Sequence, residues 1–151
     1  MIVTVRRATS ADRATLAEYN HAMAWETEHK ALDAATLVSG VAAVFDDLAK
    51  GFYLVAEVDS RVVGQLLITT EWSDWRDGWF WWIQSVYVRP DERKQGVFRS
   101  LFAEAERLAR NAGDVVGLRL YVERENVNAQ RTYESLGMND AGYLVFEKML
   151  R

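Results

Sequence analysis

The chain has 151 residues, of which 50% are hydrophobic and 26% charged, as is typical of one soluble globular domain. Its net charge of −4 comes without a basic stripe, which argues against nucleic-acid binding, and the lack of cysteine excludes disulfides, thiolate metal sites and a cysteine nucleophile. No signal peptide or transmembrane run is visible, so we expect a single cytoplasmic domain over residues 1–151 with no membrane partner.

The first half of the sequence predicts a strand, two helices and a β-hairpin. Period-two alternation marks the strands, and apolar residues at helical spacing mark the second helix. The expected elements are a strand over Ile2–Arg7, a helix from Ser10 to about Asn20, an irregular charged segment over His21–Asp33, a helix over about Ala34–Lys50, and strands over Phe52–Val58 and Arg61–Thr69 joined at Asp59 and Ser60.

The second half predicts alternating strands and helices after an aromatic segment that turns at Asp77 and Gly78. The expected elements are a strand over about Trp79–Val88, a helix over about Val97–Ala112, a buried strand over Val115–Val122, a short helix over about Asn128–Leu136 and a last strand over Tyr143–Leu150. Three consecutive strands in the middle favour a mixed α/β domain over a doubly wound nucleotide-binding fold.

The stretch Ser85–Ala109 contains the first functional motif: an apolar strand, the only proline, a basic loop with a glycine, and an amphipathic helix. The first amides of a helix lack intrahelical partners and lie at the positive end of its dipole, so they attract anions. Gly96 allows a ligand to approach the backbone closely. We therefore predict a pocket for a phosphate or pyrophosphate, formed by Arg93, Lys94, Gln95, Gly96, Val97, Phe98 and Arg99.

The second motif is the segment NVNAQRTYESLGM, Asn126 to Met138. Ala129 and Tyr133 are four residues apart and share a helix face, with Gly137 one step further along. The small residue one turn before the tyrosine leaves room for a ligand to reach the hydroxyl group. A tyrosine at helical spacing is also common in a core, and that alternative reading stays open for the segment alone.

In this order and spacing, the two motifs resemble the GNAT superfamily of acetyl-CoA-dependent N-acetyltransferases, from about Phe52 to the last residue. The family loop is usually Arg/Gln-x-x-Gly-x-Gly/Ala; Arg93 and Gly96 match it, and Phe98 stands at the small third position. The resemblance implies an α/β fold with a mixed, mostly antiparallel sheet splayed after its central strand and helices on both faces. It places acetyl-CoA against Val86, Tyr87, Val88, the residues of the basic loop and helix start, Asn126, Ala129 and Tyr133.

The resemblance also implies direct transfer of an acetyl group to a primary amine in a ternary complex. Tyrosine has an ordinary pKa of about 10, so Tyr133 is protonated at neutral pH and is expected to protonate the departing thiolate. The N–H group of Val86 is expected to stabilise the oxyanion. The acceptor is a small-molecule or peptide amine, and nothing in the sequence selects among them.

The general base is expected on a segment other than the central strand, because residues 81–85 contain no carboxylate. Glu26 and Glu28 are the first candidates, followed by Glu71; solvated surface glutamates are the alternative interpretation. Alternation puts Gln84 on the strand face of Val86 and Val88, where it can position a water molecule. We expect the acceptor site to include Trp25, Glu71 and Gln84. The two histidines, His21 and His29, lack metal-ligand spacing, so we expect no metal.

Five tryptophans lie within residues 72–82, at Trp72, Trp75, Trp79, Trp81 and Trp82. They form either a stacking surface for a flat or cationic substrate or a strand-packing or dimer surface, so a homodimer is possible. Alternation sends Trp79 and Trp81 to one face and Trp82 to the other. The competing function for the whole chain is a catalytically inactive CoA-binding sensor or interaction module. No G-x-S-x-G or P-loop motif supports a serine hydrolase or an NTPase.

Overall fold

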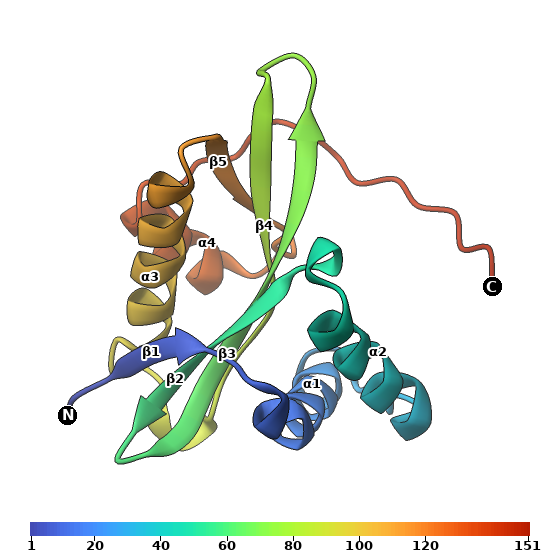
Figure 1. The fold of residues 1–151 in the computed structure, drawn as a ribbon, viewed down its shortest axis with the longest axis vertical. Coiled ribbons are helices and arrows are strands. Elements are labelled where there is room, and N and C mark those ends of the chain that lie inside the picture. Colours follow the sequence, from blue (N-terminus) through green and yellow to red (C-terminus); the bar gives the residue numbers. More distant parts are fainter. The chain divides into compact units, whose positions relative to one another are not determined.

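A computed structural model describes residues 1–151, which divide into two units, Met1–Tyr121 and Val122–Arg151. Figure 1 shows the elements in chain order. The first unit contains β1 (Thr4–Arg7), α1 (Arg13–Glu28), α2 (Ala34–Asp46), β2 (Phe52–Val58), β3 (Arg61–Ser73), β4 (Gly78–Val88), α3 (Val97–Ala112) and β5 (Val115–Leu120), and the second contains α4 (Val127–Ser135). Short 3-10 turns occupy Ser10–Asp12, Leu48–Lys50 and Pro90–Glu92. None of the helices is long and apolar enough to cross a membrane.

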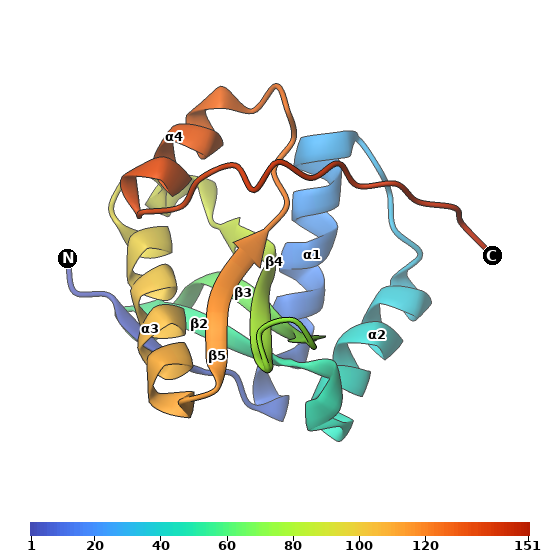
Figure 2. The same ribbon diagram turned by 90° about the horizontal axis from the view of Figure 1, so that it is seen from above.

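The first unit is built on a five-stranded sheet whose strands lie in the order β1-β2-β3-β4-β5. The pairs from β1 to β4 are antiparallel, whereas β5 joins β4 in parallel after the chain has crossed over through α3 (Figure 2). The ladder between β4 and β5 ends where Ile83 pairs with Leu120. Residues Gln84–Val88 therefore have β3 as their only strand partner, so one edge of β4 is uncovered there.

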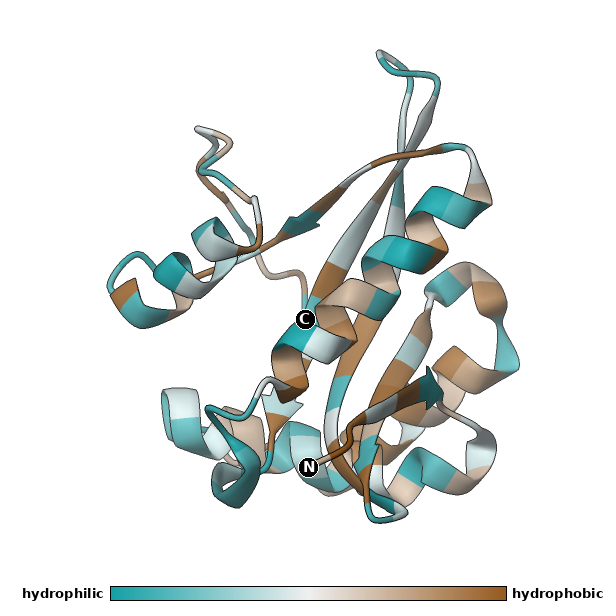
Figure 3. Ribbon diagram, turned by 90° about the vertical axis from the view of Figure 1, so that its left-hand side faces the viewer, coloured by the Kyte–Doolittle hydropathy of each residue, from teal (hydrophilic) through white to brown (hydrophobic).

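Helices cover both faces of the sheet, as neighbouring residues of β3 show. A Cβ atom at Gly64 would lie against Val97 and Leu101 of α3, whereas the side chain of Gln65 hydrogen bonds to Asn20 of α1. Adjacent strand residues point to opposite faces, so α3 lies on one face and α1 on the other. The central strands are the most hydrophobic part of the ribbon in Figure 3, and their fully buried residues include Leu54, Val55, Val63, Leu66 and Ile68.

The fold class predicted from the sequence is confirmed, and α3 has the predicted bounds. The hairpin between β2 and β3 turns at Asp59 and Ser60, which have φ angles of 51° and 61°. Helix α1 continues to Glu28, so the prediction of an irregular segment from His21 is wrong over its first eight residues. That stretch is rich in charge and lacks a clear apolar stripe, which hides the helix from a pattern based on hydrophobic period.

The predicted last strand over Tyr143–Leu150 is wrong: this segment forms no ladder with any strand. The alternation that suggested it is present in the residues, but a strand also needs a hydrogen-bonded neighbour. Within the chain, β5 pairs with β4 alone. The segment therefore has the pattern of a strand without the partner that would make it one.

The close approach of α3 to β3 at Gly64 gives a test of the packing. An added Cβ would lie 2.9 Å from Cγ1 of Val97 and 3.3 Å from the carbonyl oxygen of Tyr87, so Gly64→Ala must displace the helix or the strand. We expect it to lower the free energy of unfolding by about 1–3 kcal/mol in urea titrations. Gly40→Ala in α2 is the control: its Cβ meets nothing within 4 Å, so this variant should gain about 0.5–1 kcal/mol. Equal effects at the two glycines would contradict the packing.

Candidate functional site

A β-bulge in β4 shapes the uncovered edge. Leu67 pairs with Gln84 but Gln65 pairs with Tyr87, so two residues of β4 oppose one residue of β3. Ser85 lies in this bulge with a left-handed φ of 51°. The fully buried side chain of Gln65 donates from Nε2 to the Ser85 carbonyl at 2.9 Å and to Oδ1 of Asn20 at 2.8 Å. A buried amide from the neighbouring strand thus binds the carbonyl of the bulge.

The bulge reverses which backbone groups of β4 point to the uncovered edge. Before it, the N–H group of Trp79 donates to the Asp114 carbonyl on the β5 side at 2.9 Å. After it, the N–H group of Arg89 donates to the Val63 carbonyl on the β3 side at 2.8 Å. Alternate residues of a regular strand point to the same edge, so the inserted residue must have inverted the alternation. The N–H groups of Val86 and Val88 therefore point away from β3, toward the uncovered edge.

The same bulge corrects the predicted face of Gln84. Simple alternation places Gln84 with Val86 and Val88, but its Nε2 donates to Oγ1 of Thr69 at 2.5 Å. Thr69 and Gln65 lie on the same face of β3, which is the face that α1 covers. Val88 pairs with Gly64, whose Cβ would point toward α3, so Val88 lies on the opposite face. Gln84 therefore lies on the face opposite to Val86 and Val88.

The basic loop joins this strand to α3 in a geometry suited to an anion. Lys94 and Gly96 have left-handed φ angles of 63° and 84°, and residues of this kind next to helical ones turn successive amides to one side. Gly96 is the N-cap of α3, and no side chain caps the helix. A Cβ at Gly96 would meet nothing within 4 Å. Glycine is therefore required by the backbone angle, and the space before the helix start is open.

Phe98, at the position that is usually small in the family loop, packs along the helix. Its ring centroid lies 6.1 Å from that of Phe102, one turn further on. Val97 beside it is buried, while Lys94, Gln95 and Arg99 are exposed. The loop therefore exposes cationic and amide side chains near the helix start.

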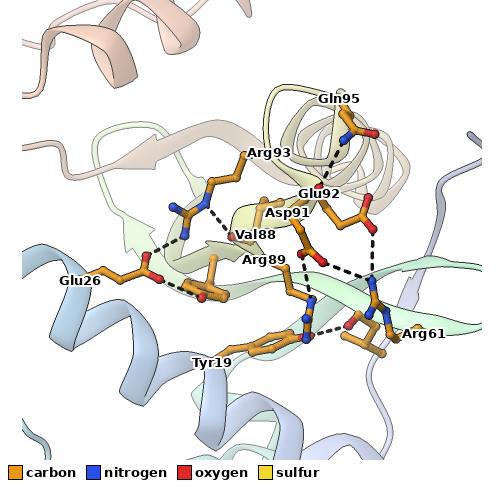
Figure 4. A network of polar contacts seen from close by, with 11 residues as sticks. Tyr19, Glu26, Arg61, Val88, Arg89, Asp91, Glu92, Arg93 and Gln95 are labelled. Carbon is orange, nitrogen blue, oxygen red and sulfur yellow. Dashed lines mark hydrogen bonds and ion pairs between the residues drawn. The ribbon is translucent and has the colours of Figure 1, made fainter.

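The end of α1 meets the loop through Glu26, as Figure 4 shows. Arg93 donates from Nη2 to Oε2 of Glu26 at 2.6 Å and from Nε to the Val88 carbonyl at 2.8 Å. The Tyr87 hydroxyl donates to Oε1 of Glu26 at 3.1 Å, and burial, together with this bond, raises the pKa of Tyr87. Two predicted residues from separate segments, Glu26 and Arg93, are thus in contact beside the uncovered edge.

The other candidate carboxylates lie elsewhere on the first unit. Glu28 is exposed at the last position of α1. Trp25, which is 55% exposed, makes an edge contact with His29 at 5.7 Å. Glu71 accepts a hydrogen bond from Nε1 of Trp82 at 3.0 Å and pairs with Arg119 at 3.3 Å. Glu71 and Glu26 therefore belong to different polar clusters.

The tryptophans divide between the two faces as alternation predicts. Each tryptophan of β4 has an aromatic neighbour within the chain: Trp79 lies 5.0 Å from Trp72, Trp81 5.5 Å from Phe52, and Trp82 4.6 Å from Tyr121. These contacts show that several of the rings pack against the protein itself.

In the second unit, Asn126 and Gly137 define the ends of α4. Oδ1 of Asn126 accepts from the N–H of Ala129 at 3.2 Å, which caps the start of the helix. Gly137 has a φ of 91°, and the N–H of Met138 donates to the Tyr133 carbonyl at 3.0 Å, which closes the other end in a Schellman motif. Ala129 and Tyr133 share a face of this helix. Burial raises the pKa of Tyr133, so its hydroxyl stays protonated at neutral pH.

A comparison with known protein families agrees with these features. The sequence profile described as the acetyltransferase (GNAT) family matches residues 11–138, and the chain belongs to this family. Its structure is similar to that of a possible acetyltransferase from Clostridium difficile 630, with 44% identity, a TM-score of 0.91 and coverage of 100% of this chain and 99% of that one. The resemblance inferred from the two motifs is thereby confirmed, and proteins of this family bind acetyl-CoA or CoA.

More distant structures share the fold alone. The aminoglycoside N-acetyltransferase AAC(6')-Iy in complex with CoA has 14% identity and a TM-score of 0.80, covering 99% of this chain and 96% of that one. The ribosomal-protein-alanine N-acetyltransferase from Brucella melitensis biovar Abortus 2308 has 17% identity and a TM-score of 0.79, covering 99% and 100%. No protein with a curated description matches the chain.

The contribution of the Gln65 hydrogen bonds to the stability of the bulge can be measured. Gln65→Met keeps the length of the side chain but leaves the carbonyl oxygens of Ser85 and Asn20 without this donor. We expect a loss of about 1–3 kcal/mol in the free energy of unfolding, the usual cost of an unsatisfied buried polar group. Gln130 is a control because its Nε2 also donates to two carbonyls, at 3.1 and 2.8 Å, but in an exposed setting. Gln130→Met should cost less than about 0.5 kcal/mol; similar losses for both would contradict the role of Gln65.

Proposed function

We propose that this protein is an N-acetyltransferase that transfers an acetyl group from acetyl-CoA directly to a primary amine, with residues 1–151 acting as one cytoplasmic domain. The observation that supports this most strongly is the pairing of two backbone features in the first unit. The N–H groups of Val86 and Val88 point to an uncovered strand edge, and the same strand leads through a basic loop to the uncapped start of α3 at Gly96.

Each part of this arrangement fits one part of the donor. The N–H group of Val88 suits an amide carbonyl of a pantetheine arm, which would lie along β4 like an added strand, and the N–H group of Val86 suits the thioester carbonyl at the end of that arm. The backbone at Gly96 and Val97, with the side chains of Arg93 and Lys94, suits a pyrophosphate. The space where a Cβ at Gly96 would lie is open, which fits a ligand approaching the backbone. Further contacts are proposed from Gln95, Phe98, Arg99, Asn126 and Ala129.

Bound acetyl-CoA supplies a thioester whose carbonyl carbon forms the new C–N bond as its C–S bond breaks. The N–H group of Val86 stabilises the negative charge that develops on the carbonyl oxygen. Tyr133 donates its hydroxyl proton to the departing thiolate, and its raised pKa keeps that proton available.

The incoming amine must lose a proton, and Glu26 is the base that the geometry favours. It accepts a hydrogen bond from Tyr87, the residue between Val86 and Val88. Its ion-pair partner is Arg93, and a pyrophosphate that attracts Arg93 would leave the Glu26 carboxylate free to accept a hydrogen bond from the amine. Glu28 and Glu71 are the alternative bases.

The acceptor is a small-molecule or peptide amine that binds beside Trp25, Glu71 and Gln84. An indole face favours a cation by about 0.5–2 kcal/mol, and Trp25 is exposed enough to provide one. The alternative function is a CoA-binding sensor or interaction module without catalysis. The absence of a carboxylate from residues 81–85 and the phenylalanine at position 98 favour this alternative, whereas Tyr133 with its raised pKa favours the enzyme.

Replacing Tyr133 tests the proposed function. Tyr133→Phe should lower kcat at least about tenfold, because the thiolate loses its proton donor, while the Kd of acetyl-CoA changes little. Since the pKa of Tyr133 is raised, the wild type should retain kcat up to about pH 10, and the variant should lack that alkaline limb.

The readouts are thiol release with a panel of amines and calorimetric titration with acetyl-CoA. Tyr143→Phe, at a tyrosine that is 72% exposed, is the matched control and should be unaffected. Unchanged turnover in Tyr133→Phe would remove this residue from the mechanism. Binding of CoA without turnover of any amine in the wild type would favour the sensor.

A further inference from the structure

A pocket lies between α1, α2 and the start of β2, where the two helices pack side by side (Figure 2). Its volume is about 300 Å³, and the residues that line it include Asn20, Leu37, Val41 and Tyr53. For comparison, a cavity of about 150 Å³ lined by apolar side chains is large enough to bind benzene. The pocket therefore has room for one ring with its substituents.

Gly40 leaves part of this pocket open. It lies within α2 and lines the pocket, and a Cβ at this position would meet nothing within 4 Å. Its φ is not in the left-handed range, so an alanine would fit the backbone. Glycine destabilises the interior of a helix relative to alanine. Neither the backbone nor the packing of the chain requires glycine here, whereas a ligand lying against α2 would need the space.

The floor of the pocket contains a polar pair among apolar side chains. Nδ2 of Asn20 donates to the hydroxyl oxygen of Tyr53 at 3.5 Å, and both residues are buried. This distance is long for a hydrogen bond. The hydroxyl is the acceptor in it, which leaves its own proton available to another acceptor. Burial raises the pKa of Tyr53, so the hydroxyl keeps that proton at neutral pH.

Bonds within the chain hold this floor in position. Oδ1 of Asn20 accepts a hydrogen bond from Nε2 of Gln65 at 2.8 Å, and the ring of Tyr53 stacks on that of Phe45 with 6.1 Å between centroids. A donor that is already oriented loses little conformational entropy when a ligand binds. The Tyr53 hydroxyl is therefore a preorganised donor for a ligand oxygen.

The rim of the pocket carries a negative charge. Asp33 lines the pocket and is exposed, and the hydroxyl and backbone N–H of Thr36 donate to its carboxylate, which lowers its pKa. A carboxylate at the entrance repels anions, and burial of an anion among apolar side chains is costly. The rim therefore selects against a negatively charged occupant.

We propose that this pocket binds a small neutral aromatic compound whose carbonyl or hydroxyl oxygen accepts a hydrogen bond from Tyr53. The ring lies over Gly40 and against Leu37 and Val41, and the oxygen reaches the polar floor. None of the lining residues is among the proposed contacts of acetyl-CoA or of the acceptor amine. The site is therefore independent of the acetyltransferase function.

Acetophenone is the probe for this site, because it has one ring and a carbonyl oxygen but no amine that the protein could acetylate. A titration followed by the backbone amide signals in NMR spectra should show saturable binding, with the largest shifts at Gly40 and Val41. No saturable binding, or shifts centred outside the pocket, would refute the site.

Gly40→Leu tests the space over α2. Leucine is a strong helix former, so the variant should unfold at the same temperature as the wild type or higher. Its side chain fills the pocket, which should raise the Kd of acetophenone at least about tenfold. Ser39→Leu is the matched control, because Ser39 is exposed on the same helix and does not line the pocket. A destabilised Gly40→Leu protein, or an unchanged Kd in a stable one, would contradict the open pocket.

Tyr53→Phe tests the hydrogen bond to the ligand oxygen. The variant keeps the ring and loses the proton, so the Kd of acetophenone should rise about fivefold. Toluene, which has the ring without the oxygen, should bind the wild type and the variant equally. No change for acetophenone, or the same loss for both probes, would remove the hydroxyl from the site and overturn the proposal.

Discussion

The hydrogen bond from Gln65 to the carbonyl of Ser85 holds the feature on which the rest of the site depends, the bulge in β4. One inserted residue turns the N–H groups of Val86 and Val88 toward the edge that β5 leaves uncovered. It also turns Tyr87 toward α1, where its hydroxyl meets Glu26. The backbone donors at the uncovered edge and the contact of Tyr87 with the carboxylate of Glu26 are therefore consequences of the same irregularity, which is held by a fully buried amide.

The second element, the ion pair between Glu26 and Arg93, joins the end of α1 to the basic loop that precedes α3. The Arg93 side chain is 43% exposed and that of Glu26 36%, so the pair is screened by solvent. Partly exposed pairs of this kind contribute on the order of 0–1 kcal/mol. The pair is thus weak enough for Arg93 to exchange Glu26 for the pyrophosphate of the proposed donor.

The sequence correctly predicted those elements whose ends are set by residues within the element itself or directly beside it. The bounds of α3 follow from Gly96, Gly113 and the apolar period between them, and the two motifs were sufficient to identify the family. The bulge at Ser85 was not predictable, because period-two alternation contains no mark of an inserted residue. Without the bulge, Gln84 was assigned to the wrong face of the strand. The contact of Glu26 with Arg93 joins residues 67 positions apart, which no motif connects. The predicted strand over Tyr143–Leu150 was wrong because alternation shows which side chains would share a face of a strand, but does not show which strand would pair with it.

Amide hydrogen exchange at three consecutive residues of β4 tests the central claim most directly. In the free protein, the amides of Val86 and Val88 should exchange quickly, while that of Tyr87, which points to β3, should be protected. Saturation with CoA should slow exchange at Val86 and Val88 and leave Tyr87 unchanged. Uniform protection of all three in the free protein would contradict the inverted alternation. Binding of CoA with no change at Val86 and Val88 would contradict the uncovered edge as the donor site.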